Sequence, residues 1–540
     1  MSIIKLLSVS IFAVTLILSG GNSAGSGEMN DVSLYTKSKF FVMTKEELKV
    51  SEATGEVSVI TGIKSIDEKN SRYGINKIKP LFRLNNGDPA VFNELGMSRI
   101  YVFYAEATAD ISKAVSDYSS DLNIEYSEPN YIGFAAGKPG RDFKGILSDA
   151  VSMPNDTYFY KQWYLKNVGD VMPTAGGKGK SGADINIVKA WDIETGNDNI
   201  IVAILDSGIN DDSPDLAGKL WVNKKEIWGN GRDDDNNGYI DDVKGWNFAA
   251  DNNDNHDGFG HGTNIASVIG AKANNNYGFA GMNFKAKLMN CKNLTDDNSG
   301  EYEWWAKSIQ YAVDNGARVI NMSEGGSDYS KTLKKAVEYA INKGVFLSAA
   351  MMNYGTGKSY YPAAFPGVFA VGATDTDDKR CKQFTWGGGS CWGKHIQVVA
   401  PGNRIYGVDY ENVNGFDLYW SGTSQATAEV SGLVSLLLSQ NQSRTIDDIK
   451  KIITSTARDQ IGDAYEDKPG WDQYMGWGRI DCLASLKYEY KGKIKQENTT
   501  QEEVQPREDN TSKQKDAKAT KPQPARAKKQ DADDGRAKKR

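Results

Sequence analysis

The chain has 540 residues, a formal net charge of -6 and a sequence pI near 5.5. Hydrophobic residues make up 39% of it, which allows a sizeable core, and the length favours more than one domain. The acidic balance argues against a partner held by general positive charge, so no nucleic-acid partner is expected.

The first 24 residues have the layout of a secretory signal peptide. One lysine precedes an apolar run over residues 6–18, and small residues follow that run. The run is short for a transmembrane helix, which needs about 20 apolar residues. We therefore expect a secreted, extracellular protein with no stable membrane span in its mature form; the periplasm and the cell surface are alternatives. An uncleaved anchor is the competing interpretation.

A small α+β domain is expected at residues 28–135. Its last part predicts a strand, a helix and a second strand, because β-branched and aromatic residues flank a segment of helical periodicity. In chain order these segments read "SRIYVFYA", "TADISKAVSDYSSD" and "LNIEYSEPNYI". The residues between Tyr131 and Asn155 then have the composition of an exposed linker.

The pattern changes over residues 154–490. Short apolar runs without alternation predict buried parallel strands, and helical segments lie between several of them. The runs include "NIIVAILDSG", "ARVINMSEGG", "GVFLSAA", "GVFAVGAT" and "IQVVAPG". We expect an α/β fold, a three-layer sandwich with a mostly parallel central sheet. Chemistry in such sheets gathers at the carboxyl ends of the strands.

The last segment, residues 491–540, is polar and mixed in charge, with almost no apolar residues. Such a composition cannot form a core, so a disordered charged tail is expected. Binding to an acidic surface is the alternative role for it.

The chain has four cysteines, of which Cys381 and Cys391 bracket a glycine-rich loop. In an exported protein this spacing favours a disulfide, with two free thiols as the alternative. Cys291 and Cys482 fall in a predicted strand and a predicted helix, where burial is enough to explain them. No CxxC spacing exists, so a cysteine-ligated zinc site is not expected.

Three polar residues stand where strands end or helices begin. Asp206 ends a buried strand, His261 opens an amphipathic helix, and Ser424 opens a long apolar helix. Each alone is explained as a capping residue. Together they are the parts of a nucleophilic site, because a serine hydroxyl needs a base, and a carboxylate holds imidazole in the right tautomer.

On these residues the chain resembles the subtilisin-like serine endopeptidases, the subtilase family. The motifs that carry the resemblance are "AILDSGI", "GHGTNIASVIGA", "VINMSEGG", "YYPAAFPGVFAVGAT", "VVAPG" and "SGTSQATAEVSG". They lie in order within residues 156–490, and the chain order Asp, His, Ser is that of subtilisin. The piece that ends in "IEYSEPNYI" is similar to the family's inhibitory propeptide.

The resemblance implies roles for further residues. In the family, an asparagine after a Val-Ala-Ala-Ala-Gly strand stabilises the oxyanion, and Asn353 stands at that position here. A preorganised amide at this place stabilises the charge that develops in the transition state. The substrate cleft is then expected at Ser323, Glu324, Gly325 and Met352, with substrate backbone added as a strand against "SEGG".

The chain departs from the family pattern at several of these positions. Met352 replaces the usual glycine before the oxyanion asparagine, and a long side chain there would shrink the primary specificity pocket. Glu324 replaces leucine, and would either favour a basic substrate side chain or point to solvent. Ala428 replaces the usual proline, and Gln425 stands where many relatives have methionine.

One acidic loop follows the spacing of a calcium-binding loop. Asp233, Asp235 and Asn237 occupy its first, third and fifth positions, with a glycine at the sixth. Tyr239 would add a carbonyl, and Asp241 or Asp242 a carboxylate. The twelfth position is a lysine rather than a glutamate, so this is not a complete EF-hand, and a solvated acidic loop is the alternative.

The resemblance implies a second calcium site, and the sequence offers a third candidate. The second is formed by side chains and carbonyls of Asp215, Ala273, Asn275, Tyr277 and Phe279. The third candidate is the segment "ADNNDNHDG", with Asp251, Asp254 and Asp257. We expect Ca²⁺ as a structural ion at one or more sites.

The sequence therefore predicts a secreted serine endopeptidase, made with a propeptide that acts as its intramolecular inhibitor and is removed by the enzyme itself. Its partners would be protein or peptide substrates. The alternative from another class is a catalytically impaired binding or scaffold protein on the same fold. An esterase ranks last, because no Gly-x-Ser-x-Gly motif is present within residues 154–490, where the buried strands are predicted.

Overall fold

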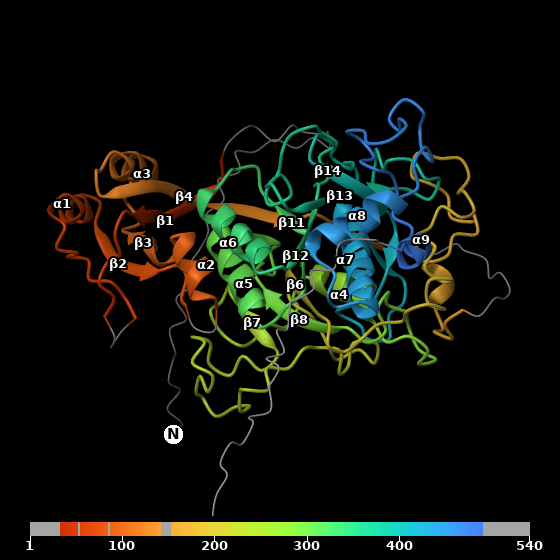
Figure 1. Cartoon of the computed structure of the whole chain (residues 1–540), viewed down its shortest axis with the longest axis horizontal. Coiled ribbons are helices and arrows are strands. Elements are labelled where there is room, and N and C mark those ends of the chain that lie inside the picture. Colours follow the sequence, from red (N-terminus) through yellow and green to blue (C-terminus); the bar gives the residue numbers. More distant parts are fainter. Residues whose placement is uncertain (1–32, 52–54, 85–86, 142–152, 490–540) are drawn as a thin grey trace, which may run out of the picture. The chain divides into compact units, whose positions relative to one another are not determined.

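The structure, a computed structural model, describes residues 33–51, 55–84, 87–141 and 153–489 (Figure 1). The expected signal peptide, most of the linker and the charged tail lie outside the described residues. Among those that are described, no helix combines the length and the apolarity needed to cross a bilayer.

An antiparallel sheet with helices on it forms the N-terminal domain, which we define as residues 33–135. Its strands follow the order β4-β1-β3-β2. The bounds are β1 Tyr35–Thr44, α1 Lys64–Arg72, β2 Ile75–Pro80, α2 Pro89–Glu94, β3 Ile100–Ala105, α3 Ile111–Ser119 and β4 Ile124–Ala135. The predicted strand, helix and strand correspond to β3, α3 and β4, but β4 continues beyond the predicted end.

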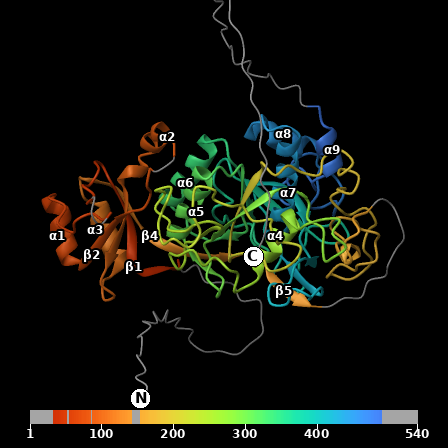
Figure 2. The same ribbon diagram turned by 90° about the horizontal axis from the view of Figure 1, so that it is seen from below.

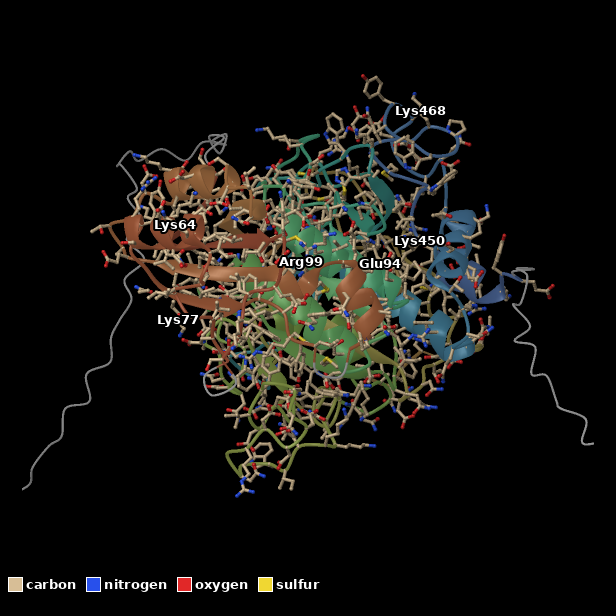
Figure 3. All side chains as sticks on the ribbon, turned by 60° about the vertical axis from the view of Figure 1, so that its left-hand side comes forward. Lys64, Lys77, Glu94, Arg99, Lys450 and Lys468 are labelled. Atoms are coloured by element: carbon tan, nitrogen blue, oxygen red, sulfur yellow. The ribbon has the colours of Figure 1, made fainter. Side chains whose placement is uncertain are left out.

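Aromatic packing and one arginine hold this domain together. The Tyr118 ring of α3 packs edge-on against Phe40 of β1 and Phe103 of β3, at 5.3 and 5.5 Å between centroids. At the end of β1, Arg99 donates to the carbonyls of Thr44 and Lys45 (Figure 3). These contacts fix the strand order that presents β4 at one edge of the domain.

A parallel sheet is the centre of the second domain, residues 153–489, which we call the α/β domain. Its strands follow the order β14-β13-β12-β10-β6-β8-β7. They are β6 Ile201–Asp206, β7 Gly245–Asn247, β8 Lys287–Lys292, β10 Val319–Met322, β12 Phe346–Ala350, β13 Phe369–Thr374 and β14 Ile396–Pro401. The expected fold class is confirmed.

Helices cover both faces of this sheet (Figure 1). Successive residues of a strand face opposite layers, so Leu205 packs with one core and Ile204 with the other. The first core includes α5 Tyr302–Asp314 and α6 Lys331–Asn342, and the second includes α4 His261–Gly270 and α7 Thr423–Gln440. Two further helices, α8 Ile446–Thr456 and α9 Cys482–Lys487, contribute to the second core.

The strand β4 joins the two domains, because its second half enters the α/β domain. There it pairs antiparallel with β9 Ser299–Glu301 on one side and with β11 Glu324–Gly325 on the other. The chain then continues into β5 Lys138–Arg141, which pairs with β16 Leu418–Ser421 (Figure 2). In turn β16 pairs with β15 Ile405–Tyr406.

Side chains of β4 also cap two helices of the α/β domain. Glu128 accepts hydrogen bonds from the amides of Lys331 and Thr332 at the start of α6, at 2.9 and 2.8 Å. Asn130 accepts from the amide of Glu303 at the start of α5, at 3.1 Å. A carboxylate is favoured at a helix N-terminus, so these contacts stabilise the position of β4.

The four cysteines are all buried and free, so the expected disulfide is absent. Cys381 packs in the core on the α7 side of the central sheet, whereas Cys391 packs in the core on the α5 side. The prediction was wrong because the two thiols enter opposite layers, although the Ser390 amide next to Cys391 donates to the Cys381 carbonyl at 2.8 Å.

Candidate active site

The predicted acid and base lie together at the carboxyl end of the sheet. Asp206 ends β6, and His261 is the first residue of α4. The Nδ1 atom of His261 lies 2.8 and 2.9 Å from the two carboxylate oxygens of Asp206, and both side chains are buried. This contact fixes the ring so that Nε2 is the nitrogen that faces the cleft.

Ser424 is the second residue of α7. Its hydroxyl donates to the carbonyl oxygen of Ser323 at 3.0 Å. Among the described residues no hydrogen bond joins it to His261, whose Nε2 atom is buried without a partner. Rotation about one side-chain bond is therefore needed before this hydroxyl can reach a base.

The carbonyl oxygen of Ala136, one residue after β4, lies between two donors. The side-chain amide of Asn353 donates to it at 2.6 Å, and the backbone amide of Ser424 donates at 3.3 Å. Asn353 is itself held by Thr423, whose amide donates to its side-chain oxygen at 2.9 Å. The amide nitrogen that donates to Ala136 is therefore preorganised.

The chain on both sides of Ala136 is extended and paired with the cleft. The Ala136 amide donates to Ser323 at 2.8 Å, and β11 and β9 flank the residues before it. Gly422 lies under the peptide bond between Ala136 and Gly137, because a Cβ there would stand 2.1 Å from the Ala136 oxygen. A Cβ on Gly137 would stand 2.8 Å from Nε2 of His261. The Ala136–Gly137 bond thus lies beside both the predicted base and the predicted nucleophile.

The cleft has little room beside this strand. Met352 is 2% exposed and has a φ of 74°, and its sulfur would lie 2.6 Å from a Cβ placed on Gly325. Its side chain therefore fills space next to the "SEGG" segment. Further back, a Cβ on Gly133 would stand 2.3 Å from the Trp305 ring. The strand therefore carries a glycine where the Trp305 ring approaches it, and Met352 lies against the neighbouring strand β11.

The Glu324 side chain is buried, which corrects the expectation that it points to solvent, whereas the expected basic preference stays a prediction. It is 1% exposed, and Asn293 donates to its Oε1 atom at 3.0 Å. Burial raises the pKa of the Glu324 carboxyl well above its usual range. Burial therefore disfavours the charged form of this carboxyl, which a preference for basic side chains would need.

The residues predicted for the second calcium site meet around Asp215. Its carboxylate accepts from the amide of Phe279 and the side chain of Asn275, at 2.8 and 2.9 Å. Burial raises the pKa of Asp215 to about 6, and the charge of Asp156 adds to that shift. Asp156 was missed by the sequence analysis, because it lies far from the motif in the chain.

The first predicted loop gathers three carboxylates, and one of them was not foreseen. Atoms of Glu226, Asp233 and Asp235 lie within 4.8 Å of one another. Asn237 belongs to the same turn through its amide, which donates to Asp233 at 2.9 Å. The backbone of Tyr239 follows this turn, and its amide donates to Asn237 at 2.8 Å.

Asp242 is not one of the three carboxylates of this cluster, and its assignment as a ligand stays a prediction. Its carboxylate accepts hydrogen bonds from Asn223, Asn237 and Tyr311, at 2.9, 2.9 and 2.6 Å. Asn223 also donates to Asp235 of the loop, so Asp242 is a buried carboxylate beside the cluster, held by neutral donors. In the third candidate segment, Asp257 instead caps α4 by accepting from Gly260 and Thr263.

Comparisons with known proteins agree with this geometry. Residues 197–478 match the sequence model of the subtilase family. A thermophilic serine proteinase from Bacillus sp. (strain AK1) is 31% identical over 379 residues, which cover 70% of this chain and 77% of that protein. Thermitase from Thermoactinomyces vulgaris is 33% identical over 335 residues, which cover 62% of this chain and 99% of thermitase.

The crystal structure of fervidolysin from Fervidobacterium pennivorans, described as a keratinolytic enzyme related to subtilisin, shares the fold. The two structures superpose with a TM-score of 0.59 at 22% identity, over 86% of this chain and 62% of that chain. This chain therefore spans less than two thirds of the fervidolysin chain. With a family match and relatives of this kind, the chain belongs to the subtilase family of serine endopeptidases.

Proposed function

We propose that the chain is a secreted serine endopeptidase in which Asp206, His261 and Ser424 form the catalytic triad. The Ser424 hydroxyl turns from Ser323 towards His261, loses its proton to Nε2 and attacks the carbonyl carbon of the substrate. Asp206 stabilises the imidazolium that forms. The amides of Asn353 and Ser424 stabilise the oxyanion of the tetrahedral intermediate.

The first substrate is the chain itself, and the bond it cuts is Ala136–Gly137. The observation that carries this proposal is the Ala136 carbonyl oxygen, which already accepts from Asn353 and Ser424. An acyl group must occupy this position for attack, so the strand lies there as a substrate does. Residues before this bond then act as an inhibitory propeptide, because β4 remains paired in the cleft.

A catalytically impaired binding protein is the competing function, and the departures from the family pattern motivated it. Its strongest support is Met352, which narrows the cleft without touching the triad. All the groups that the reaction needs are nevertheless present: an acid–base pair at 2.8 Å, a serine at a helix N-terminus and two oxyanion donors. The enzyme is therefore the better supported function.

Ser424→Ala should abolish self-cleavage and labelling by a serine-reactive fluorophosphonate. The full chain, expressed with calcium, should yield a mature fragment whose first residue is Gly137, whereas the variant should stay uncut while folded. Intact mass and N-terminal sequencing measure both. The matched control Ser439→Ala, on the same helix but outside the site, should behave as wild type.

Three outcomes would contradict parts of this account. An uncut, folded and unlabelled wild-type chain would favour the binding protein. Cleavage of wild type and Ser424→Ala at the same bond would mean that another protease matures the chain. A first residue other than Gly137 in the initial product would contradict the assignment of the Ala136–Gly137 bond.

Met352→Gly should widen the specificity of the mature enzyme. Glycine adopts a φ of 74° without strain, and loss of the side chain opens space beside Gly325. We expect kcat/KM for a peptide with phenylalanine before the cut bond to rise by about tenfold relative to its alanine counterpart. The control Met351→Leu should leave this ratio unchanged. An unchanged ratio in Met352→Gly would show that another group limits the pocket.

Calcium fits two places in the α/β domain, and we propose that it stabilises the fold. At the site around Asp215, the side chains of Asp156, Asp215 and Asn275 would hold the ion, together with the carbonyls of Ala273, Tyr277 and Phe279. The fit rests on the Oδ1 atom of Asp156, which is buried and has no hydrogen-bond partner among the described residues. At the acidic loop, oxygen ligands would come from Glu226, Asp233, Asp235 and Asn237.

Removal of calcium by EDTA should lower the melting temperature of the uncut Ser424→Ala chain. An ion at a hundredfold excess over its Kd stabilises a protein by about 2.7 kcal/mol. Asp156→Asn should remove at least half of the calcium-dependent shift, measured by calorimetry. Asp170→Asn, which removes an exposed charge elsewhere, should leave the shift as it is. A wild-type chain that melts at the same temperature with and without calcium would exclude a structural ion.

A further inference from the structure

The segment after Gly137 is also held by the α/β domain, and its last residue carries a charge. In the β5–β16 pair, Lys138 stands opposite Ser421, and Arg141 stands opposite Leu418. Arg141 is the fifth residue after the Ala136–Gly137 bond. Its position is therefore fixed relative to that bond by an extended and paired backbone.

An acidic cluster of Asp409, Glu411 and Asp417 surrounds the Arg141 guanidinium. Nη1 lies 2.6 Å from Oδ2 of Asp409 and 3.0 Å from Oδ1 of Asp417, and Nη2 lies 3.8 Å from Glu411. The pKa of Arg141 is raised, first of all by the hydrogen bond to Asp409. Two of the acids are exposed, but the Asp409 side chain is not.

Asp409 is the buried member of the acidic cluster and is held by backbone amides. It is 1% exposed, and its Oδ1 atom accepts from the amides of Glu411 and Asn412, at 3.0 and 3.4 Å. Apart from Arg141, its buried Oδ2 atom has no hydrogen-bond partner in the described part of the chain. A side chain on Gly415 would come within 2.7 Å of that oxygen, so the loop is shaped around it.

We propose that the acidic cluster is a substrate subsite, which selects arginine or lysine at the fifth position after the cleaved bond. This inference rests on the proposed self-cleavage, which cuts the covalent link between the N-terminal domain and the segment that begins at Gly137. A buried carboxylate without a counter-ion is costly, so the vacated site favours a cation. Lys161 lies near Asp417 but donates to the carbonyl of Phe416, at 2.7 Å.

The subsite differs from the cleft before the bond in what it recognises. Before the bond, the Trp305 ring lies so close to Gly133 that only a small residue fits there. After the bond, the strand runs over Tyr419, with Lys138 above the Trp386 ring at 5.0 Å, until it reaches the acids. Arginine suits such a place because its planar group can meet two carboxylates at once.

Peptide hydrolysis tests the proposal. The enzyme is the full chain with Arg141→Gln, after self-processing, so that its own arginine does not compete. Two internally quenched peptides are compared, Gly-Phe-Ala-Ala-Gly-Lys-Pro-Gly-Arg and the same sequence ending in glutamine. We expect kcat/KM to be about tenfold higher for the arginine peptide, mainly through KM, and the preference to shrink in 1 M salt.

Variants of the cluster separate its members. The preference is the ratio of kcat/KM for the arginine peptide to that for the glutamine peptide. Asp409→Asn should bring this ratio close to one, and Asp417→Asn, at a more exposed position, should reduce it to about three. Asp447→Asn removes the same charge from the exposed start of α8 and should keep the full preference. Equal rates for the two peptides, or a preference that survives both cluster variants, would overturn the proposal.

A second measurement separates this proposal from the proposed function. If neither peptide is cut, the endopeptidase proposal fails. Hydrogen exchange on the uncut Ser424→Ala chain then tests whether the acidic cluster binds the arginine side chain. Arg141→Gln should raise amide exchange in β5 and β16 by at least about tenfold, since it leaves Asp409 unpaired. Lys138→Gln, which neutralises a base on the same strand, should raise it less. Equal exchange in the two variants would overturn the subsite.

Discussion

The arrangement of the two domains depends on where the carbonyl oxygen of Ala136 lies. It accepts from Asn353 and Ser424, and these donors come from the end of a parallel strand and the start of a helix. A strand that delivers a carbonyl to this point must pass between β9 and β11, and β4 does so. The capping of α5 and α6 by Asn130 and Glu128 holds the same strand from outside the cleft.

In the proposed cleavage, the two sides of the bond would be recognised by different physical means. Before the bond, side-chain size would decide, because Trp305 lies close to Gly133 and Met352 fills space beside Gly325. Burial raises the pKa of the Glu324 carboxyl and so disfavours a negative charge there. After the bond, charge would decide, because Asp409 is fixed by backbone amides and lies against Arg141. The two proposals together would suit small, flexible sequences that are followed by a basic residue.

Local patterns in the sequence were enough to predict most of the framework. Unbroken apolar runs marked the parallel strands, and helical periodicity marked α3 to α7, because both follow from which faces are buried. The positions of Asp206, His261 and Ser424 at element ends followed from the same boundaries. The resemblance added Asn353, whose amide lies at the Ala136 oxygen.

What could not be predicted depends on contacts between distant segments. Nothing local marks Asp156 as a neighbour of Asp215, or Glu226 as a neighbour of Asp233. The spacing of Asp242 fits a calcium loop, but nothing local shows that its carboxylate accepts a hydrogen bond from Tyr311, which lies far along the chain. The Cys381–Cys391 spacing likewise said nothing about which layer each thiol enters. In each case the decisive partner comes from packing between elements.

The rate of self-cleavage in Asn353→Ala tests the central claim most directly. The claim is that the Ala136 carbonyl lies in a working oxyanion hole. Loss of one such donor slows acyl transfer by about 10²–10³-fold. After calcium-triggered refolding, the variant should therefore process itself that much more slowly than wild type, at the same bond and with the same melting temperature. Processing at the wild-type rate by a folded variant would contradict the account.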